Sequence, residues 1–181
     1  SVPAGSGIVV NSNDGIEIFE NDLIASPLTP EEIRSRTNDL GLTIDLYQPF
    51  RDFEAVDEAQ LERNLERARR KFDLMHRLGT DTILVCSNVA TADPAHQDKS
   101  VSQLARLAEV AGDNGIRVAY EALAWGSLVS EYDQAWELVK QVDHSALGIC
   151  LDSFHILSRG TSLETISEIP GEKIFFCQLA D

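Results

Sequence analysis

The stretch IRVAYEAL (residues 116–123) decides the fold: it is a short β-rich run that closes on the carboxylate of Glu121. Apart from Arg117, the residues before Glu121 are apolar, which is typical of a strand buried on both faces of a parallel sheet. LGICLDSFH (residues 147–155) has the same form and places Asp152 after an apolar run. A helical pattern over residues 130–142 separates the two runs, so they predict consecutive βα units with right-handed crossovers.

The same alternation of strand and helix extends through the rest of the chain. Further strand-like runs are GIEIFE (15–20), LTIDLYQPF (42–50), TDTILVCSN (80–88) and KIFFCQLAD (173–181). Helical patterns cover residues 57–78 and 102–111, a shorter one covers 161–168, and Thr29 followed by Pro30 predicts another helix start. Gly41, Gly79 and Gly115 stand where helix C-terminal caps are expected.

Six strands alternating with helices fit a doubly wound sheet or a (β/α)₈ barrel. No glycine-rich phosphate loop follows any strand, which disfavours a nucleotide-binding doubly wound sheet. Polar side chains collect instead at the carboxyl ends of the strands. They are Glu20, Gln48, Arg51, Ser87, Asn88, Glu121, Asp152, His155, Gln178 and Asp181. In a barrel these ends open on one face, where active sites are assembled, so the pattern favours the barrel.

Composition excludes several classes of function. The 181 residues predict one domain over residues 1–181, and 43% hydrophobic residues are ordinary for a globular domain. Fifteen Lys and Arg against thirty Asp and Glu give a net charge of −15, which argues against nucleic-acid binding. No apolar run reaches the roughly 20 residues that span a bilayer, and residues 1–5 do not resemble a signal peptide. We therefore expect no nucleic acid and no membrane.

Three cysteines, Cys86, Cys150 and Cys177, stand in apolar runs without short spacings. An odd number at such spacings disfavours a disulfide framework or a zinc ribbon. We expect all three to be buried thiols in a reducing, cytoplasmic location.

Glu121, Asp152 and Gln178 offer three hard oxygen donors on neighbouring strands. A carboxylate is costly to bury unless it is paired or metal-bound, although a strand-end acid in solvent is the plainer alternative. Oxygen donors suit Mg²⁺ or Mn²⁺, with Co²⁺ tolerated. His155 follows Asp152 by three residues and remains open as a ligand, a general base or a hydrogen-bonding group.

The remaining strand-end residues predict contacts to an acidic small molecule. Arg51 suits a bidentate bond to a substrate carboxylate, the alternative being an ion pair with Asp52 or Glu54. Trp125 either lines the pocket or packs against the protein. The other expected substrate contacts are Gln48, Ser87 and Asn88.

Five segments carry a more specific signal: YEALAWG (120–126), LDSFH (151–155), IPGEKIFFCQLAD (169–181), QPFRDFE (48–54) and LVCSN (84–88). Together they resemble the metal-dependent 3-dehydroshikimate dehydratases of the sugar phosphate isomerase/epimerase superfamily, which are related to xylose isomerase. The resemblance implies a xylose isomerase-like (β/α)₈ TIM barrel with one divalent ion held by Glu121, Asp152, Gln178 and a Glu on the eighth strand. It places His155 against substrate oxygens and makes His155 and Glu121 the expected catalytic residues.

The implied reaction converts 3-dehydroshikimate to protocatechuate and water through an enediolate, in quinate and shikimate catabolism. Barrels of this kind need about 250 residues, so we expect an incomplete barrel containing strands two to seven, with residues 6–12 matching the end of a first helix. Open sheet edges invite association, which makes a homo-oligomer an expectation. Two alternatives stay open: a keto-sugar (phosphate) isomerase or epimerase of the same superfamily, and a non-catalytic truncated remnant. The stretch QPFRDFE favours an acidic ring substrate over a neutral sugar.

Overall fold

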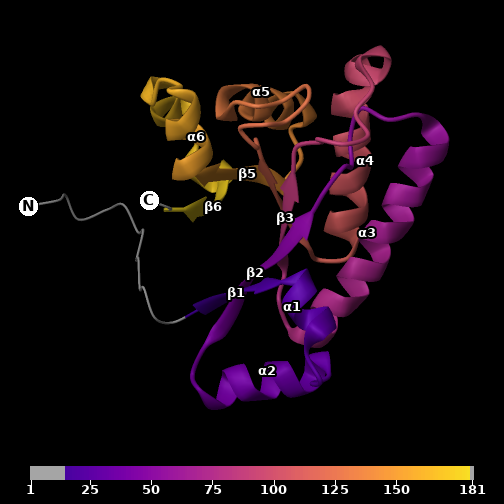
Figure 1. Ribbon diagram of the computed structural model, residues 1–181, viewed down its shortest axis with the longest axis vertical. Helices are drawn as coiled ribbons and strands as arrows, with labels where there is room; N and C mark the ends of the chain where they lie inside the picture. The colour runs from indigo at the N-terminus through magenta and orange to yellow at the C-terminus, as the bar shows by residue number, and fades with distance from the viewer. Residues whose placement is uncertain (1–14, 180–181) are drawn as a thin grey trace, which may run out of the picture.

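Six parallel strands form one curved sheet in the computed structural model, which describes residues 15–179 (Figure 1). The strands are β1 (Gly15–Phe19), β2 (Thr43–Phe50), β3 (Thr82–Cys86), β4 (Arg117–Glu121), β5 (Leu147–Asp152) and β6 (Ile174–Gln178). Each strand pairs with the next one in the sequence, in the order β1-β2-β3-β4-β5-β6. A doubly wound sheet would reverse its strand order, so the consecutive order confirms the prediction of an incomplete (β/α)₈ barrel.

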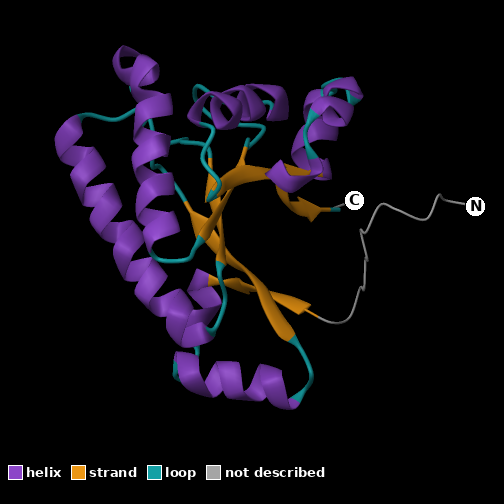
Figure 2. Ribbon diagram, turned by 180° about the vertical axis from the view of Figure 1, so that it is seen from behind, coloured by secondary structure: helices purple, strands orange, loops and turns teal. Residues whose placement is uncertain are grey.

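Helices cover the convex side of the sheet and leave its concave side open (Figure 2). They are α1 (Glu20–Ala25), α2 (Pro30–Asp39), α3 (Glu58–Leu78), α4 (Ser100–Asp113), α5 (Tyr132–Val142) and α6 (Ser153–Arg159). Three short 3₁₀ turns are η1 (Pro94–Lys99), η2 (Glu164–Glu168) and η3 (Gly171–Lys173). None of the helices among residues 15–179 is both long and apolar enough to cross a membrane.

Local signals explain where the helices begin and end. Thr29 and Glu32 form a reciprocal capping box at the start of α2, and the side chain of Asp57 accepts the Gln60 N–H at the start of α3. Gly79 ends α3 in the left-handed region with φ 79°. These are the start and stop positions that the sequence predicts.

Four features differ from the sequence prediction. Residues 153–155 belong to helix α6 rather than to a strand, because the carboxylate of Asp152 accepts the Phe154 N–H at 2.7 Å and caps a new helix. Likewise Glu20 begins α1, and residues 164–168 form a 3₁₀ turn where an α-helix is predicted. The prediction that all three cysteines are buried is wrong for Cys177, which is exposed on β6, a strand with a neighbour on one side only in the described sheet.

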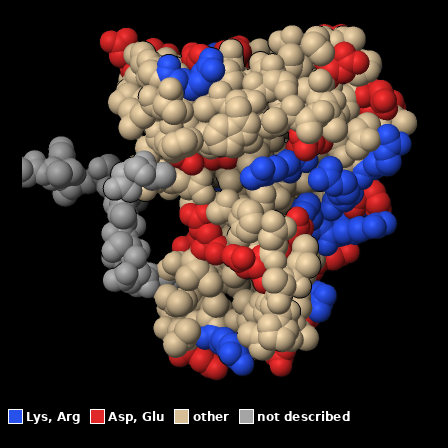
Figure 3. All heavy atoms as spheres, viewed as in Figure 1, with Lys and Arg blue, Asp and Glu red and all other residues tan. Residues whose placement is uncertain are grey.

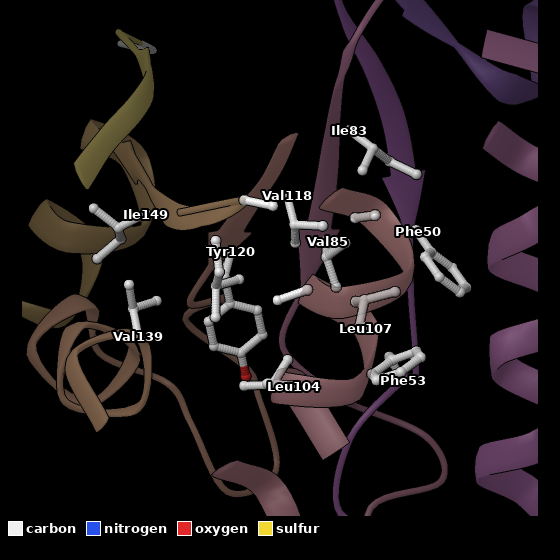
Figure 4. Close-up of a cluster of buried hydrophobic side chains, with 14 of the residues drawn as sticks. Phe50, Phe53, Ile83, Val85, Leu104, Leu107, Val118, Tyr120, Val139 and Ile149 are labelled. Carbon is white, nitrogen blue, oxygen red and sulfur yellow. The ribbon is translucent and has the colours of Figure 1, made fainter. Parts of the chain in front are cut away.

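Two apolar layers lie on opposite sides of the sheet. The larger one packs strand side chains such as Val85, Val118 and Ile149 against the helices, with Leu104 and Leu107 of α4 on the other side (Figure 4). The smaller one faces the concave side. It comprises Leu46, Leu84, Cys86, Ala119, Leu123 and Cys150, with Phe175 and Phe176 packed against it. This inner layer is the floor beneath the carboxyl ends of the strands.

Candidate functional site

The carboxyl ends of β4 and β5 bring three ligand-type side chains together. Ligand atoms of Glu121, Asp152 and His155 all lie within 4.8 Å of one another. Glu121 and His155 are buried, with 3% and 8% of their surface exposed. Glu121 ends β4 and Asp152 ends the neighbouring β5, so the parallel sheet itself creates this cluster.

The pKa of Glu121 is raised to about 7: burial raises it most, a hydrogen bond from the Cys86 thiol opposes that rise, and the negative charge of Asp152 adds to it. The Cys86 Sγ donates to Glu121 Oε2 at 3.3 Å. Carboxylates that crowd in a poorly solvated place require a positive charge to stay ionised together. Oxygen donors under this repulsion fit a hard divalent cation, as the sequence predicts.

Gln178 reaches the same region from β6, and its amide is oriented by an acid that the sequence analysis missed. Its Nε2 donates to Glu17 Oε2 at 2.8 Å, and the Nε2 of Gln48 donates to the same oxygen. With the amide nitrogen engaged, the oxygen of Gln178 is the atom left to bind a cation. The sequence does contain a signal for Glu17, which stands between Ile16 and Ile18. Because side chains alternate along a strand, Glu17 must face the opposite side of β1 from these two isoleucines.

His155 lies on α6, and its imidazole has a fixed environment. Its Nδ1 accepts the backbone N–H of Ala124 at 3.2 Å. The rings of Trp125 and Phe154 meet it edge-on, at centroid distances of 4.9 and 5.3 Å. The pKa of His155 is lowered, because burial lowers it by more than the nearby charge of Asp152 raises it. Trp125 is itself 54% exposed, so it stands beside the cluster with one side open to solvent.

Arg51 lies on the loop after β2. It does not form the ion pair with Asp52 or Glu54 that was the alternative to binding a substrate carboxylate. Within residues 15–179, Asp52 is occupied by the N–H groups of Val89 and Ala90, and Glu54 accepts the Asn88 N–H and the Tyr120 hydroxyl. Arg51 is exposed, and its charge lowers the pKa of Glu121, which places its guanidinium near the cluster.

Ser87 and Asn88 are buried and hydrogen-bonded within the protein. The Ser87 Oγ accepts the Leu123 N–H at 3.0 Å, and Asn88 Nδ2 donates to the Glu54 carbonyl at 2.7 Å. In this structure they tie neighbouring loops together, and substrate contact by either one stays a prediction.

Glu20, another strand-end residue, does not join the cluster. Glu20 instead accepts the Tyr47 hydroxyl at 2.6 Å and pairs with Lys71 of α3. Asp181 and residues 6–12 lie outside the described residues.

Charge is unevenly distributed over the molecule. Asp and Glu side chains gather beside the hollow in the middle of the face seen in Figure 3, whereas Lys and Arg line the side covered by α3. A second hollow, of about 690 Å³, lies at the amino-terminal ends of the strands, where Thr43, Thr82 and Arg117 line it. That hollow is at the opposite end of the strands from the carboxylates and holds none of the expected site residues.

A family model, the xylose isomerase-like TIM barrel, matches residues 12–181. The chain belongs to this family. Family membership agrees with the consecutive parallel strands and with a polar site at their carboxyl ends.

Among relatives of this xylose isomerase-like chain, the 3-dehydroshikimate dehydratase of Pseudomonas putida is 53% identical over 168 residues. That match covers 93% of this chain and 26% of the relative, so the chain spans about a quarter of the curated protein's length.

Solved structures show the same fold. A xylose isomerase-like TIM barrel/4-hydroxyphenylpyruvate dioxygenase fusion protein superposes with a TM-score of 0.90 at 53% identity, covering 93% of this chain and 27% of that one. The IOLI protein, crystallised with a zinc atom, superposes with a TM-score of 0.82 at 22% identity, covering 93% of this chain and 63% of that one.

Proposed function

We propose that this chain carries most of the active site of a metal-dependent 3-dehydroshikimate dehydratase. The observation that carries the proposal is the 53% identity to the Pseudomonas putida enzyme of that name across 93% of the chain. The convergence of Glu121 and Asp152, with Gln178 on the next strand, supports it. The reaction removes one hydrogen from carbon and one hydroxyl group from the ring, which leave together as water.

Glu121, Asp152 and the amide oxygen of Gln178 would hold the divalent cation. Their oxygens favour Mg²⁺ or Mn²⁺, with Co²⁺ as a third candidate. The IOLI protein, which has a similar fold, was crystallised with a zinc atom, and this supports a bound cation. When bound, the cation supplies Lewis-acid polarisation of the substrate ketone and so eases formation of an enediolate.

The chain's own side chains bind and orient the substrate. Arg51, exposed near the cluster and without an ion pair to Asp52 or Glu54, would take the ring carboxylate. Trp125 would form one wall of the pocket, and His155 would contact a substrate oxygen. These groups suit an acidic ring better than the neutral sugar of a keto-sugar isomerase, because Arg51 then has an anionic partner.

The test is an assay of protocatechuate formation by its ultraviolet absorbance, with Mn²⁺ or Mg²⁺ and with EDTA. It is run on this chain and on the natural gene product. Metal-dependent product supports the proposal. No product from a folded, metal-binding natural gene product would overturn it and favour a keto-sugar isomerase. Folding without metal binding would favour the non-catalytic alternative.

Arg51→Met tests the substrate class in the same assay. Loss of a charge-assisted bond of roughly 1.5–3 kcal/mol predicts a decrease in kcat/KM of about 10- to 100-fold, mainly through KM. Arg69→Met is the matched control, since Arg69 is an exposed arginine on α3. Equal effects of the two substitutions would show that Arg51 does not bind the carboxylate.

A further inference from the structure

Glu54 is a buried acid that no step of the proposed reaction uses. Only 3% of its surface is exposed. Its Oε1 accepts the Asn88 N–H and the Tyr120 hydroxyl, both at 2.8 Å, whereas its Oε2 has no hydrogen-bond partner within residues 15–179. A buried polar atom without a partner is costly, and an apolar side chain would avoid that cost. What an apolar side chain could not supply is the pair of hydrogen bonds at Oε1.

The carboxyl of Glu54 connects three strand ends that build the site. Glu54 itself follows Arg51 by three residues, on the loop after β2. Asn88 follows β3, and Tyr120 immediately precedes Glu121 on β4. The Tyr120 ring is fully buried in the apolar layer between the sheet and the helices, so its hydroxyl is a fixed donor (Figure 4). One side chain thus joins the loop of Arg51 to the strand of Glu121.

The loop that carries Arg51 is held along its whole backbone. Each carbonyl of residues 51–56 accepts a hydrogen bond from a neighbouring part of the protein, at a distance between 2.7 and 3.3 Å. The donors are Arg67, Asn64, Asn88, Asp93 and Gln103. The backbone of this loop is therefore preorganised before a substrate binds.

Two residues of the loop adopt a conformation that favours glycine. Asp52 and Ala55 have φ angles of 59° and 58°, in the left-handed region. This conformation is unfavourable, and Ala55 lacks the short polar side chain that eases it at Asp52. Glu54 stands next to Ala55, and its hydrogen bonds to the neighbouring strand ends oppose relaxation. Without them the loop should relax, and Arg51 should move with it.

Arg51 depends on this backbone for its position. Its own carbonyl accepts a hydrogen bond from Arg67, but its side chain has no hydrogen bond or ion pair within residues 15–179. Its charge lowers the pKa of Glu121, so the guanidinium lies near the carboxylate cluster. The loop is thus what determines where this charge meets a bound molecule.

We propose that Glu54 is a positioning residue, which holds the loop of residues 51–56 so that Arg51 meets the carboxylate of the substrate. It acts through the two hydrogen bonds at its Oε1. This role rests on the proposed function, because the carboxylate is the partner assigned there to Arg51. It differs from a role in packing, which would change the stability of the protein and leave its affinity for the carboxylate unchanged.

Two substitutions of Glu54 in the natural gene product test this role. Glu54→Met removes the acceptor with little change in size, so KM should rise about 10-fold while kcat stays within about 2-fold. Burial raises the pKa of Glu54 by more than its hydrogen bonds lower it, which favours the neutral acid that glutamine resembles. Glu54→Gln should therefore keep KM within about 3-fold of the unsubstituted enzyme. Equal rises of KM in both variants, or a loss of kcat alone in Glu54→Met, would overturn the positioning role.

A double substitution shows whether Glu54 acts through Arg51. Arg51→Met removes the group that Glu54 would position, so adding Glu54→Met to it should raise KM by less than about 2-fold. A further rise of about 10-fold would mean that the two residues act independently, and it would overturn the proposal.

Gln103→Met is the matched control. Gln103 is also buried, with 2% of its surface exposed, and it holds the far end of the same loop by two hydrogen bonds with the backbone of Val56. Its substitution should lower the melting temperature, as Glu54→Met does, but leave KM unchanged. An equal rise of KM in both variants would overturn the assignment to Glu54.

Tyr120→Phe serves if Glu54→Met does not fold. It removes one of the two donors to Glu54 and leaves the buried ring in place, so KM should rise about 3-fold. An unchanged KM in Tyr120→Phe would overturn the proposal.

Hydrogen exchange measured by mass spectrometry reports the state of the loop without any assay. The amides of residues 51–56 should exchange about 10-fold faster in Glu54→Met than in the unsubstituted protein, and at the unsubstituted rate in Glu54→Gln. Unchanged exchange in Glu54→Met would overturn the proposal. Faster exchange in a natural gene product that makes no protocatechuate would instead overturn the proposed function, and with it the carboxylate contact of Arg51, but not the contribution of Glu54 to the loop.

Discussion

The middle and the edges of the described sheet contribute to the site under different physical conditions. All five residues of β3 and four of the five in β4 are buried, whereas no residue of β1 or β6 is fully buried. Glu121 stands in the middle, at the end of β4. Glu17 and Gln178 stand on the two outer strands and hold each other by a side-chain hydrogen bond of 2.8 Å.

This difference divides the proposed cation site into two parts. In the middle, burial makes the charge of Glu121 costly, so a bound cation would favour its ionised form. At the edges, burial contributes less, and the orientation of Gln178 depends on one polar contact to Glu17. Substitutions in the two regions should therefore differ in both size and kind.

The largest effect on metal affinity is expected at Asp152. Asp152→Asn retains the oxygen that caps α6 but removes the charge of a proposed ligand. Metal affinity should therefore fall by more than about 100-fold, a larger loss than is usual for residues that only orient a ligand. At a Mn²⁺ concentration of about 100 times Kd, the unsubstituted protein should gain roughly 2.7 kcal/mol of stability. Thermal melting with and without Mn²⁺ should show this gain lost in Asp152→Asn and kept in Glu109→Gln, an exposed acid on α4. An unchanged Mn²⁺ response in Asp152→Asn would exclude it as a ligand.

A pair of isoleucines that face each other across β5 and β6 compares the two regions directly. Ile149 is fully buried, and its register partner Ile174 is partly exposed. Ile149→Ala should lower the free energy of unfolding by about 2–5 kcal/mol. Ile174→Ala should lower it by roughly 1–2 kcal/mol, because less apolar surface leaves water when β6 folds. Urea unfolding measures both, and equal losses would show that β6 is as tightly packed as β5.

The next effect concerns pH. The pKa of Glu121 rises from 4.5 to about 7 in the folded state without metal. A raised carboxyl pKa stabilises the fold below the unfolded value, and this stability disappears as pH rises through the folded value. Stability in EDTA should therefore fall by about 3 kcal/mol between about pH 4 and pH 8.

Glu121→Gln should remove this part of the pH dependence, since an amide does not titrate, while Glu109→Gln should retain it. Urea unfolding across the pH series is the measurement. Parallel slopes for Glu121→Gln and the unsubstituted protein would assign the dependence to other groups.

The smallest effect is expected at the edge. Glu17→Leu removes the acceptor that orients the Gln178 amide, so metal affinity should fall about 10-fold. Glu17→Gln keeps an oxygen acceptor and should recover most of that affinity. Titration calorimetry with Mg²⁺ distinguishes the cases, and equal losses in both variants would mean that the charge of Glu17 matters rather than its hydrogen bond.

Much of the architecture was predictable because it depends on local patterns. Apolar strand runs, the cap at Thr29 and the glycine after α3 act within a few residues, and each is found where expected. The exposure of Cys177 was not predictable, because an apolar run does not show whether a helix covers that face of the strand.

The site was predictable in part. Glu121 and Asp152 were identified because a carboxylate that closes an apolar strand is unusual, and the parallel sheet brings them together. Glu17 was missed because it stands inside a strand, and its contact with the candidate site is a hydrogen bond from Gln178, 161 residues away in the sequence.

The sequence alone determined the alternation of strands and helices and the polar residues at the strand ends, since periodicity and capping are local properties. Only the tertiary structure decided which of those residues meet, which are used within the protein, as Ser87 and Asn88 are, and which nitrogen of His155 accepts a backbone N–H. These outcomes depend on distances between loops remote in the chain, because a hydrogen bond forms only where the fold places a donor opposite an acceptor.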